Sequence, residues 1–303
     1  RQEYLNKRQS FVNQKKYPDN KLIITWKGKM LFKNDEQLAI FEEDVEVVKA
    51  GSKLNCEELE ITFNKKNAIQ SLTANDKVII IEQKEDYKSE IEADILTWSA
   101  NDKPAELEGK PFAKVKLGNK QLSSPKIMVF DNGKRILAND KGNLTIAPGD
   151  APGDYKADSG YIYLEWQGHM EFKRDERKAS FYENIQALKQ GMNIRCDIFD
   201  VYFDENEQVK KIVALENVYI SSDIIPNLEG LGTMLTWDVL DNVAILTGDP
   251  LAELRKEGSR TLSKTIYFDI KSKQVTWDGR SQWQIMQGDV EKTVDEATEK
   301  AQE

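Results

Sequence analysis

Hydrophobic and polar residues alternate over short stretches along most of the chain. Residues 26–32 and 166–172 both place apolar or small side chains at every second position. A period of two is typical of strands with one buried face, because successive side chains of a strand point to opposite sides. Such stretches recur about every ten residues and are separated by polar turns such as 64–67. The pattern predicts an all-β protein and excludes alternating strands and helices.

The alternating pattern occurs twice. Residues 26–33 align with 166–173 at an offset of 140, which becomes 139 at Trp98 and Trp237 and 138 at 130 and 268. A drift this small indicates loop insertions on a shared scaffold, so we interpret the chain as a duplicated domain. The predicted parts are an N-terminal arm or helix (1–20), repeat 1 (21–147), a Pro/Gly linker (148–160), repeat 2 (161–287) and an acidic tail (288–303).

Comparing the two copies separates the inner face of the strands from the outer face. Leu31 becomes Glu171 in the second copy while its neighbours keep their types, so this position is predicted to face solvent. The phase switches after Cys56 and again after Cys196, which indicates a shared bulge or bend. Trp98 and Trp237 are also in the inward phase. The other predicted inner-face residues are Met30, Phe32, Phe41, Val45, Val47, Leu59, Ile61 and Phe63 in repeat 1, and Met170, Phe172, Phe181, Ile185, Phe199, Val201 and Phe203 in repeat 2.

Composition removes several classes of function. The 303 residues carry 52 acidic and 43 basic side chains, and the net charge of −9 without a basic block argues against nucleic acid as a partner. The single histidine, His169, excludes a multi-histidine metal site and aligns with Lys29 on the outer face, where we expect it to be solvated. No Gly-rich phosphate loop is present, and the longest apolar run, 78–81, is too short to span a bilayer. We therefore predict no enzyme, no catalytic residue, no metal and no cofactor.

Two further features have ordinary structural interpretations. Cys56 and Cys196 occupy equivalent positions in separate repeats, so we predict two buried thiols rather than a disulfide. The acidic pairs at 35–36 and 175–176 resemble a glycosidase dyad only in composition, because turn residues on both sides predict exposed turns.

The order of the strand motifs resembles that of the OstA-like (LptA/LptC) family of lipopolysaccharide export. In repeat 1 the phrase runs through 41–47, Gly51 and 54–63, and residues 91–98 resemble the family's "A-D-x-L-x-Y" strand. In repeat 2 the closing phrases are 246–250 and 266–269. The resemblance covers 22–146 and 161–287. Glu43 and Glu183 replace the family's usual turn glycine, and the two cysteines stand where alanine is common.

This resemblance implies two tandem antiparallel, V-shaped, open β-jelly rolls whose inner faces bind the acyl chains of lipopolysaccharide or a related glycolipid. The fifteen inner-face residues from Met30 to Phe203 become the candidates for a lipid groove. The family also implies a periplasmic location, with any signal or anchor absent from this chain, and stacking on other Lpt-type proteins through edge strands. The residue pattern alone leaves an alternative open, in which the interior is a closed core and the protein is a structural or carbohydrate-binding β-sandwich scaffold.

Overall fold

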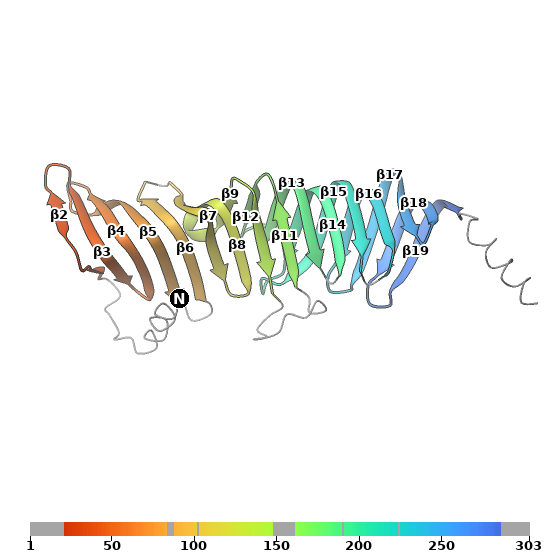
Figure 1. Ribbon diagram of the computed structural model, residues 1–303, viewed down its shortest axis with the longest axis horizontal. Helices are drawn as coiled ribbons and strands as arrows, with labels where there is room; N and C mark the ends of the chain where they lie inside the picture. Colours follow the sequence, from red (N-terminus) through yellow and green to blue (C-terminus); the bar gives the residue numbers. More distant parts are fainter. Residues whose placement is uncertain are drawn as a thin grey trace, which may run out of the picture. The chain divides into compact units, whose positions relative to one another are not determined.

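The computed structural model describes residues 21–83, 88–101, 103–147, 161–189, 191–223 and 225–285. The predicted N-terminal arm, linker and acidic tail lie outside these ranges. In the described part the chain is almost entirely strand, with one 3-10 turn, η2 (Figure 1). The elements are β1 (Ile23–Thr25), β2 (Met30–Lys33), β3 (Leu38–Lys49), β4 (Ser52–Phe63), β5 (Ile69–Gln83), β6 (Lys88–Ser99), β7 (Ala105–Leu117), β8 (Lys120–Phe130), η2 (Asp131–Gly133), β9 (Arg135–Ala138), β10 (Gly142–Ile146), β11 (Ile162–Trp166), β12 (Met170–Lys173), β13 (Lys178–Lys189), β14 (Met192–Phe203), β15 (Val209–Ser222), β16 (Leu228–Asp238), β17 (Val243–Lys256), β18 (Ser259–Asp269) and β19 (Gln274–Gln284).

The strands pack as two compact units. Unit 1 contains residues 1–101 and 115–118, and unit 2 contains 102–114 and 119–303. The division falls before the end of the first sequence repeat because β9 pairs with β12 and β10 pairs with β11. The strands that end repeat 1 therefore belong to the same packed unit as the strands that begin repeat 2.

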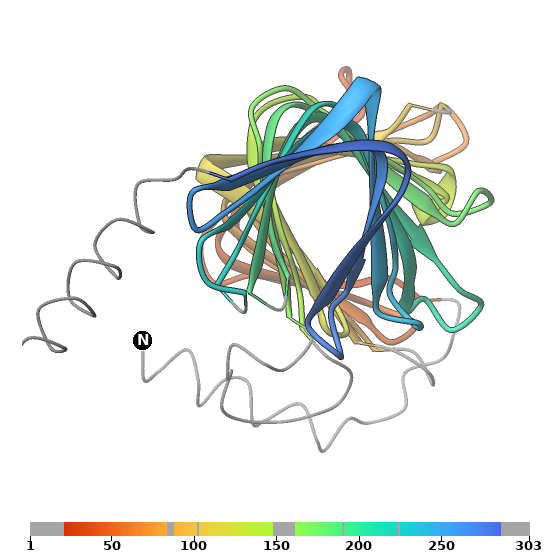
Figure 2. The same ribbon diagram turned by 90° about the vertical axis from the view of Figure 1, so that its right-hand side faces the viewer.

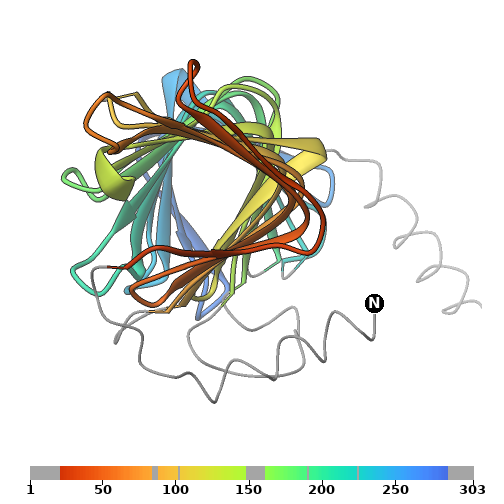
Figure 3. The same ribbon diagram turned by 90° about the vertical axis from the view of Figure 1, so that its left-hand side faces the viewer.

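In unit 1 each strand from β3 to β6 pairs antiparallel with the next, and β1 and β2 both pair with β3. Figure 3 shows the β2–β3 hairpin at the near end of this unit. Along β3, Phe41, Val45 and Val47 are buried in the alternating pattern that the sequence predicts. The predicted strand at 26–32 is wrong in one respect, because 26–29 bend away between β1 and β2. The backbone N–H groups of Lys27 and Gly28 donate to the carbonyls of Glu43 and Glu42 instead.

The long strands of both units bend at matched positions. The residue pairs 43–44 and 183–184 have positive φ, and the pairing register shifts there by one residue. The same arrangement returns at 76–77 and 216–217. These bends leave the buried phase of their own strands unchanged, but on the partner strands β4 and β14 the buried phase switches after Cys56 and Cys196. The predicted bulge or bend after each cysteine is therefore confirmed.

Unit 2 continues as antiparallel neighbours from β13 to β19, with the β18–β19 hairpin at its end (Figure 2). Its interior contains fully buried aromatic side chains, among them Trp166, Phe181, Phe199, Trp237 and Phe268. The predicted all-β antiparallel fold class is thus confirmed, and the bent strands are consistent with the predicted jelly roll. In the described ranges, no helix has the length and apolar character needed to cross a membrane.

Candidate functional site

The candidate site is the apolar inner face of the two units, and the fifteen predicted groove residues differ in how far they are covered. Ten of them are buried, namely Phe41, Val45, Val47, Leu59, Ile61, Met170, Phe181, Ile185, Phe199 and Val201. Phe63, Phe172 and Phe203 are half-buried, whereas Met30 and Phe32 are exposed. The fully covered members have no surface open to solvent, so an acyl chain reaches them only if the groups that cover them move apart.

The exposed apolar residues gather at the first strands of unit 1. Trp26 is 41% exposed although its counterpart Trp166 is 1% exposed, and Met30 is 43% exposed against 4% for Met170. The matched residues differ because the edge of β12 pairs with β9 and that of β11 pairs with β10. In the described part of unit 1, the corresponding edges of β1 and β2 have no strand beside them. These free edges therefore carry the apolar surface that a paired strand covers in unit 2.

The last strand of unit 2 carries a similar apolar surface. Trp277 and Trp283 of β19 are exposed and lie opposite Ile266 and Thr261, which are buried on the inner face. β19 is the structural counterpart of β9 and β10 in repeat 1. Ile266 of β18 pairs with Trp277 of β19 in the same way that Ile127 of β8 pairs with Ala138 of β9. The outer edge of β19 is thus the counterpart of the edge that joins the two repeats.

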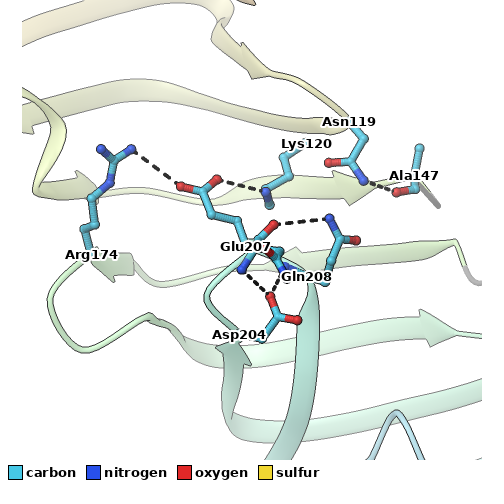
Figure 4. Close-up of polar contacts among 8 residues, drawn as sticks. Asn119, Lys120, Ala147, Arg174, Asp204, Glu207 and Gln208 are labelled. Atoms are coloured by element: carbon cyan, nitrogen blue, oxygen red, sulfur yellow. Dashed lines mark hydrogen bonds and ion pairs between the residues drawn. The ribbon is translucent and has the colours of Figure 1, made fainter. Parts of the chain in front are cut away.

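The junction between the repeats, inside unit 2, is held by ion pairs as well as by strand pairing. Arg135 of β9 pairs with Glu171 of β12 at 2.6 Å. Figure 4 shows a second group, in which the Glu207 carboxylate accepts from Lys120 Nζ at 3.2 Å and lies 3.8 Å from Arg174. Each of these pairs is partly exposed, so each contributes about 0–1 kcal/mol and helps mainly to select the register.

A glycine lets an aromatic ring lie on the backbone of the same junction. Gly142 of β10 faces Trp166 of β11, and a Cβ at position 142 would overlap the Trp166 ring and the Ser123 carbonyl. Trp166 Nε1 donates to Asp140 O at 2.9 Å, which fixes the ring in this position. The junction therefore depends on a residue without a side chain at position 142.

The sequence analysis missed a charged side chain in the interior. Lys189 is 3% exposed, and its Nζ lies 5.2 Å from the centre of the Trp237 ring. Burial lowers the pKa of Lys189 to about 8. Burying an ammonium costs several kcal/mol, whereas a cation–π contact with a desolvated indole contributes about 2 kcal/mol. The sequence contains a signal that could have predicted this burial, because Lys189 lies two residues after Ala187 and four after Ile185, in the same inward alternation.

The remaining sequence predictions can be placed as well. Cys56 and Cys196 are free, buried thiols, as predicted, and desolvation raises the pKa of each to about 12. His169 is exposed and stacks on Tyr182. The acidic pairs lie in exposed turns, and within the described ranges no group of three or more His, Cys, Asp or Glu side chains is placed to hold a metal ion.

Trp98 and Trp237 share the predicted inward phase but differ in burial. Trp237 is fully buried, whereas Trp98 is exposed even though it lies in the row of Leu72 and Ile61. That row also ends at an exposed residue on its other side, Phe32 of β2. Exposure along this row therefore marks the margins of the unit 1 inner face.

Comparison with known proteins gives one family. The family model described as "LptA/(LptD N-terminal domain) LPS transport protein" matches residues 29–135. Among solved structures that match, one is LptH from Pseudomonas aeruginosa, described as the LptA-homologous periplasmic component of a lipopolysaccharide transport device. It is 14% identical, with a TM-score of 0.37, over 41% of this chain and 94% of that one. No curated protein sequence matches the chain significantly.

Proposed function

We propose, from the premise that residues 29–135 belong to the LptA/LptD N-terminal family of lipopolysaccharide transport proteins, that this chain is a non-enzymatic bridge for a glycolipid. It acts in the periplasm, where it takes up the acyl chains of lipopolysaccharide or a related glycolipid against its inner β-faces. The lipid moves along these faces towards the outer membrane. Both sequence repeats contribute to this path.

The observation that carries the proposal is the junction inside unit 2. There, two edge strands of repeat 1 pair with two edge strands of repeat 2 and cover Trp166 and Met170. The outer edges of β1, β2 and β19 keep the same kind of apolar surface exposed. Exposed edges of this type pair readily with another sheet. We propose that other Lpt-type proteins stack on these edges and lengthen the apolar path.

The chemistry of the inner face supports a lipid as the cargo. Its residues are aliphatic, aromatic or methionine side chains, which offer apolar surface and few hydrogen-bonding groups. An acyl chain gains about 0.8 kcal/mol for each buried CH₂ group, so such a surface binds chains without specific polar contacts. Because the binding needs no specific polar contacts, the acyl chain is also free to move along the inner face.

Site-specific photocrosslinking in cells tests the proposal. A photoreactive residue at Phe41 or Phe181, both on the inner face, is expected to capture glycolipid. Lys27, which is exposed on the outer side of the bend, is the matched control and is expected to capture none. Capture from position 27 alone would contradict the proposal.

A closed scaffold is the second candidate, and the filled interior of unit 2 favours it. Phe181, Phe199 and Val201 are completely covered by other side chains. If this packing never opens, the protein is a structural or carbohydrate-binding β-sandwich. Native mass spectrometry of protein purified from cells separates the two candidates, because a bridge retains lipid and a closed scaffold does not.

A further inference from the structure

The interior of unit 2 contains a cation and an N–H donor that both lack an acceptor. Lys189 projects from β13 in the inward phase, and its Nζ contacts the Trp237 ring. Within the part of the chain that the structure describes, the Lys189 ammonium has no hydrogen-bond or ion-pair partner, and burial is the one cause of its pKa shift. The indole Nε1 of Trp237 is also buried without a partner. Buried polar atoms of native proteins normally have partners, so the unpaired Nε1 of Trp237 beside a largely buried lysine requires an explanation.

The two donors come from opposite halves of the bent sheet. Trp237 pairs with Ile212 and Ala244, on one side of the strand bends. Lys189 pairs with Met192 and Ile162, on the other side of the bend at 183–184. Their contact therefore crosses the interior, and a group that enters between the two halves lies close to both residues.

The chemistry of this pair selects a particular ligand group. An ammonium and an indole N–H donate and cannot accept when the lysine is charged, so they fit an oxygen anion. The surrounding inner-face residues, such as Met192 and Phe268, are apolar and fit an alkyl chain. We infer that Lys189 and Trp237 form a subsite for an anionic oxygen group, a carboxylate or a phosphate monoester, carried on an alkyl chain. This inference rests on the proposed function, because it assumes that amphiphiles enter the interior.

The first repeat supplies an internal comparison. The counterparts of Lys189 and Trp237 are Lys49 and Trp98, and both are exposed in unit 1. A solvated lysine gains little from binding an anion, because water already satisfies it. The subsite is thus restricted to unit 2, and position 49 offers a matched control.

Binding of three twelve-carbon probes to the full chain tests the inference. Dodecanoate and dodecyl phosphate carry the anion, and 1-dodecanol has the same chain without charge. By titration calorimetry we expect at least one anionic probe to bind at least tenfold more tightly than dodecanol. Whichever of the two anionic probes binds more tightly shows whether the subsite prefers a carboxylate or a phosphate monoester. The indole ¹H–¹⁵N resonance of Trp237, assigned with Trp237→Phe, is expected to shift with the anion bound.

Variants at the two lysine positions complete the test. Lys189→Met is expected to abolish the preference for the anion while dodecanol binding persists, which also shows that the variant is folded. Lys189→Arg and the control Lys49→Met are expected to keep the preference. Equal binding of all three probes to the unaltered chain, or an unchanged preference in Lys189→Met, would overturn the inference.

The two proposals fail in different ways. Glycolipid capture at Phe181 together with equal binding of the three probes leaves the bridge function standing and removes the subsite. If the preference for anions depends on Lys189 but no glycolipid is captured, the subsite is supported and the glycolipid is contradicted as the cargo.

Discussion

At the residue scale, the buried lysine makes stability depend on pH. The pKa of Lys189 falls from 10.5 to about 8 on folding, so the unfolded chain binds more protons between these values. Stability from this group therefore rises with pH across the window from about 8 to 10.5, by at most about 3 kcal/mol. Below pH 8 the buried charge destabilises the fold.

Lys189→Met removes this dependence. In urea unfolding, the variant is expected to be more stable than the unaltered chain at pH 7, with a difference that shrinks towards pH 10. Other groups that titrate in this window, such as the two cysteines in the unfolded state, are common to both proteins and cancel in the difference. A difference that stays constant from pH 7 to 10 would show that Lys189 does not lose its proton in this range.

The two cysteines should resist alkylation in the native state. Both thiols are buried, and desolvation raises the pKa of each to about 12, so the reactive thiolate is scarce at neutral pH. Mass spectrometry after treatment with N-ethylmaleimide at pH 7.5 is expected to find no adduct on Cys56 or Cys196. In 8 M urea, the control, both residues are expected to react. Rapid native labelling of one cysteine would mean that its repeat opens locally.

For most residues, the alternation of the sequence correctly predicted which side chains lie on the inner face. It did not predict how far each side chain is covered. Phe41 and Phe181 are buried as their alternation predicts, and the exposure of Leu31 agrees with its replacement by Glu171. Trp26 and Trp166 have the same phase, yet only Trp166 is covered. The difference in their exposure depends on whether another strand pairs at the neighbouring edge. The local alternation of residues does not predict such long-range pairing.

At the element scale, the junction between the repeats depends on close approach of β10 and β11. Gly142→Ala is expected to lower the free energy of unfolding by about 1–3 kcal/mol, because the added methyl group displaces the Trp166 ring. Thermal or urea unfolding measures the change. Ser281→Ala is the comparison at the equivalent position of β19, where we expect a loss of at most about 1 kcal/mol, because the Ser281 hydroxyl donates to Ser263 or Gly279 but no ring is displaced.

A double variant identifies the cause of the effect. In a Trp166→Leu background, Gly142→Ala is expected to cost clearly less, because the overlapping ring is gone. Additive effects of the two substitutions would mean that strain at Ser123 or in the β10 backbone is responsible. The sequence could not predict this contact, because the two residues are 24 positions apart and the intervening segment includes the proline-rich stretch.

At the scale of the whole molecule, the outer edges of β1, β2 and β19 do not reproduce the internal junction. The position of Glu171 is occupied by Leu31 at the N-terminal edge, and Gln274 stands at the C-terminal edge where the junction has Arg135. Ser281 replaces Gly142, so a second copy docking in the same register would bring its Trp26 against a side chain. The ends are therefore better suited to a different edge-strand partner than to another copy of this chain.

This difference predicts weak self-association that a few substitutions strengthen. The unaltered chain is expected to be monomeric by light scattering at tens of micromolar, because head-to-tail pairing lacks the Arg–Glu ion pair and clashes at Ser281. The variant Leu31→Glu/Gln274→Arg/Ser281→Gly rebuilds the junction chemistry at both ends and is expected to form concentration-dependent oligomers, with an apparent Kd at least tenfold lower. Leu31→Glu alone, the control, adds a charge without its partner and is expected to remain monomeric. If the unaltered chain already oligomerises as tightly as the triple variant, the ion pair and the glycine do not decide which edges pair, and the apolar surfaces of β1, β2 and β19 suffice for stacking.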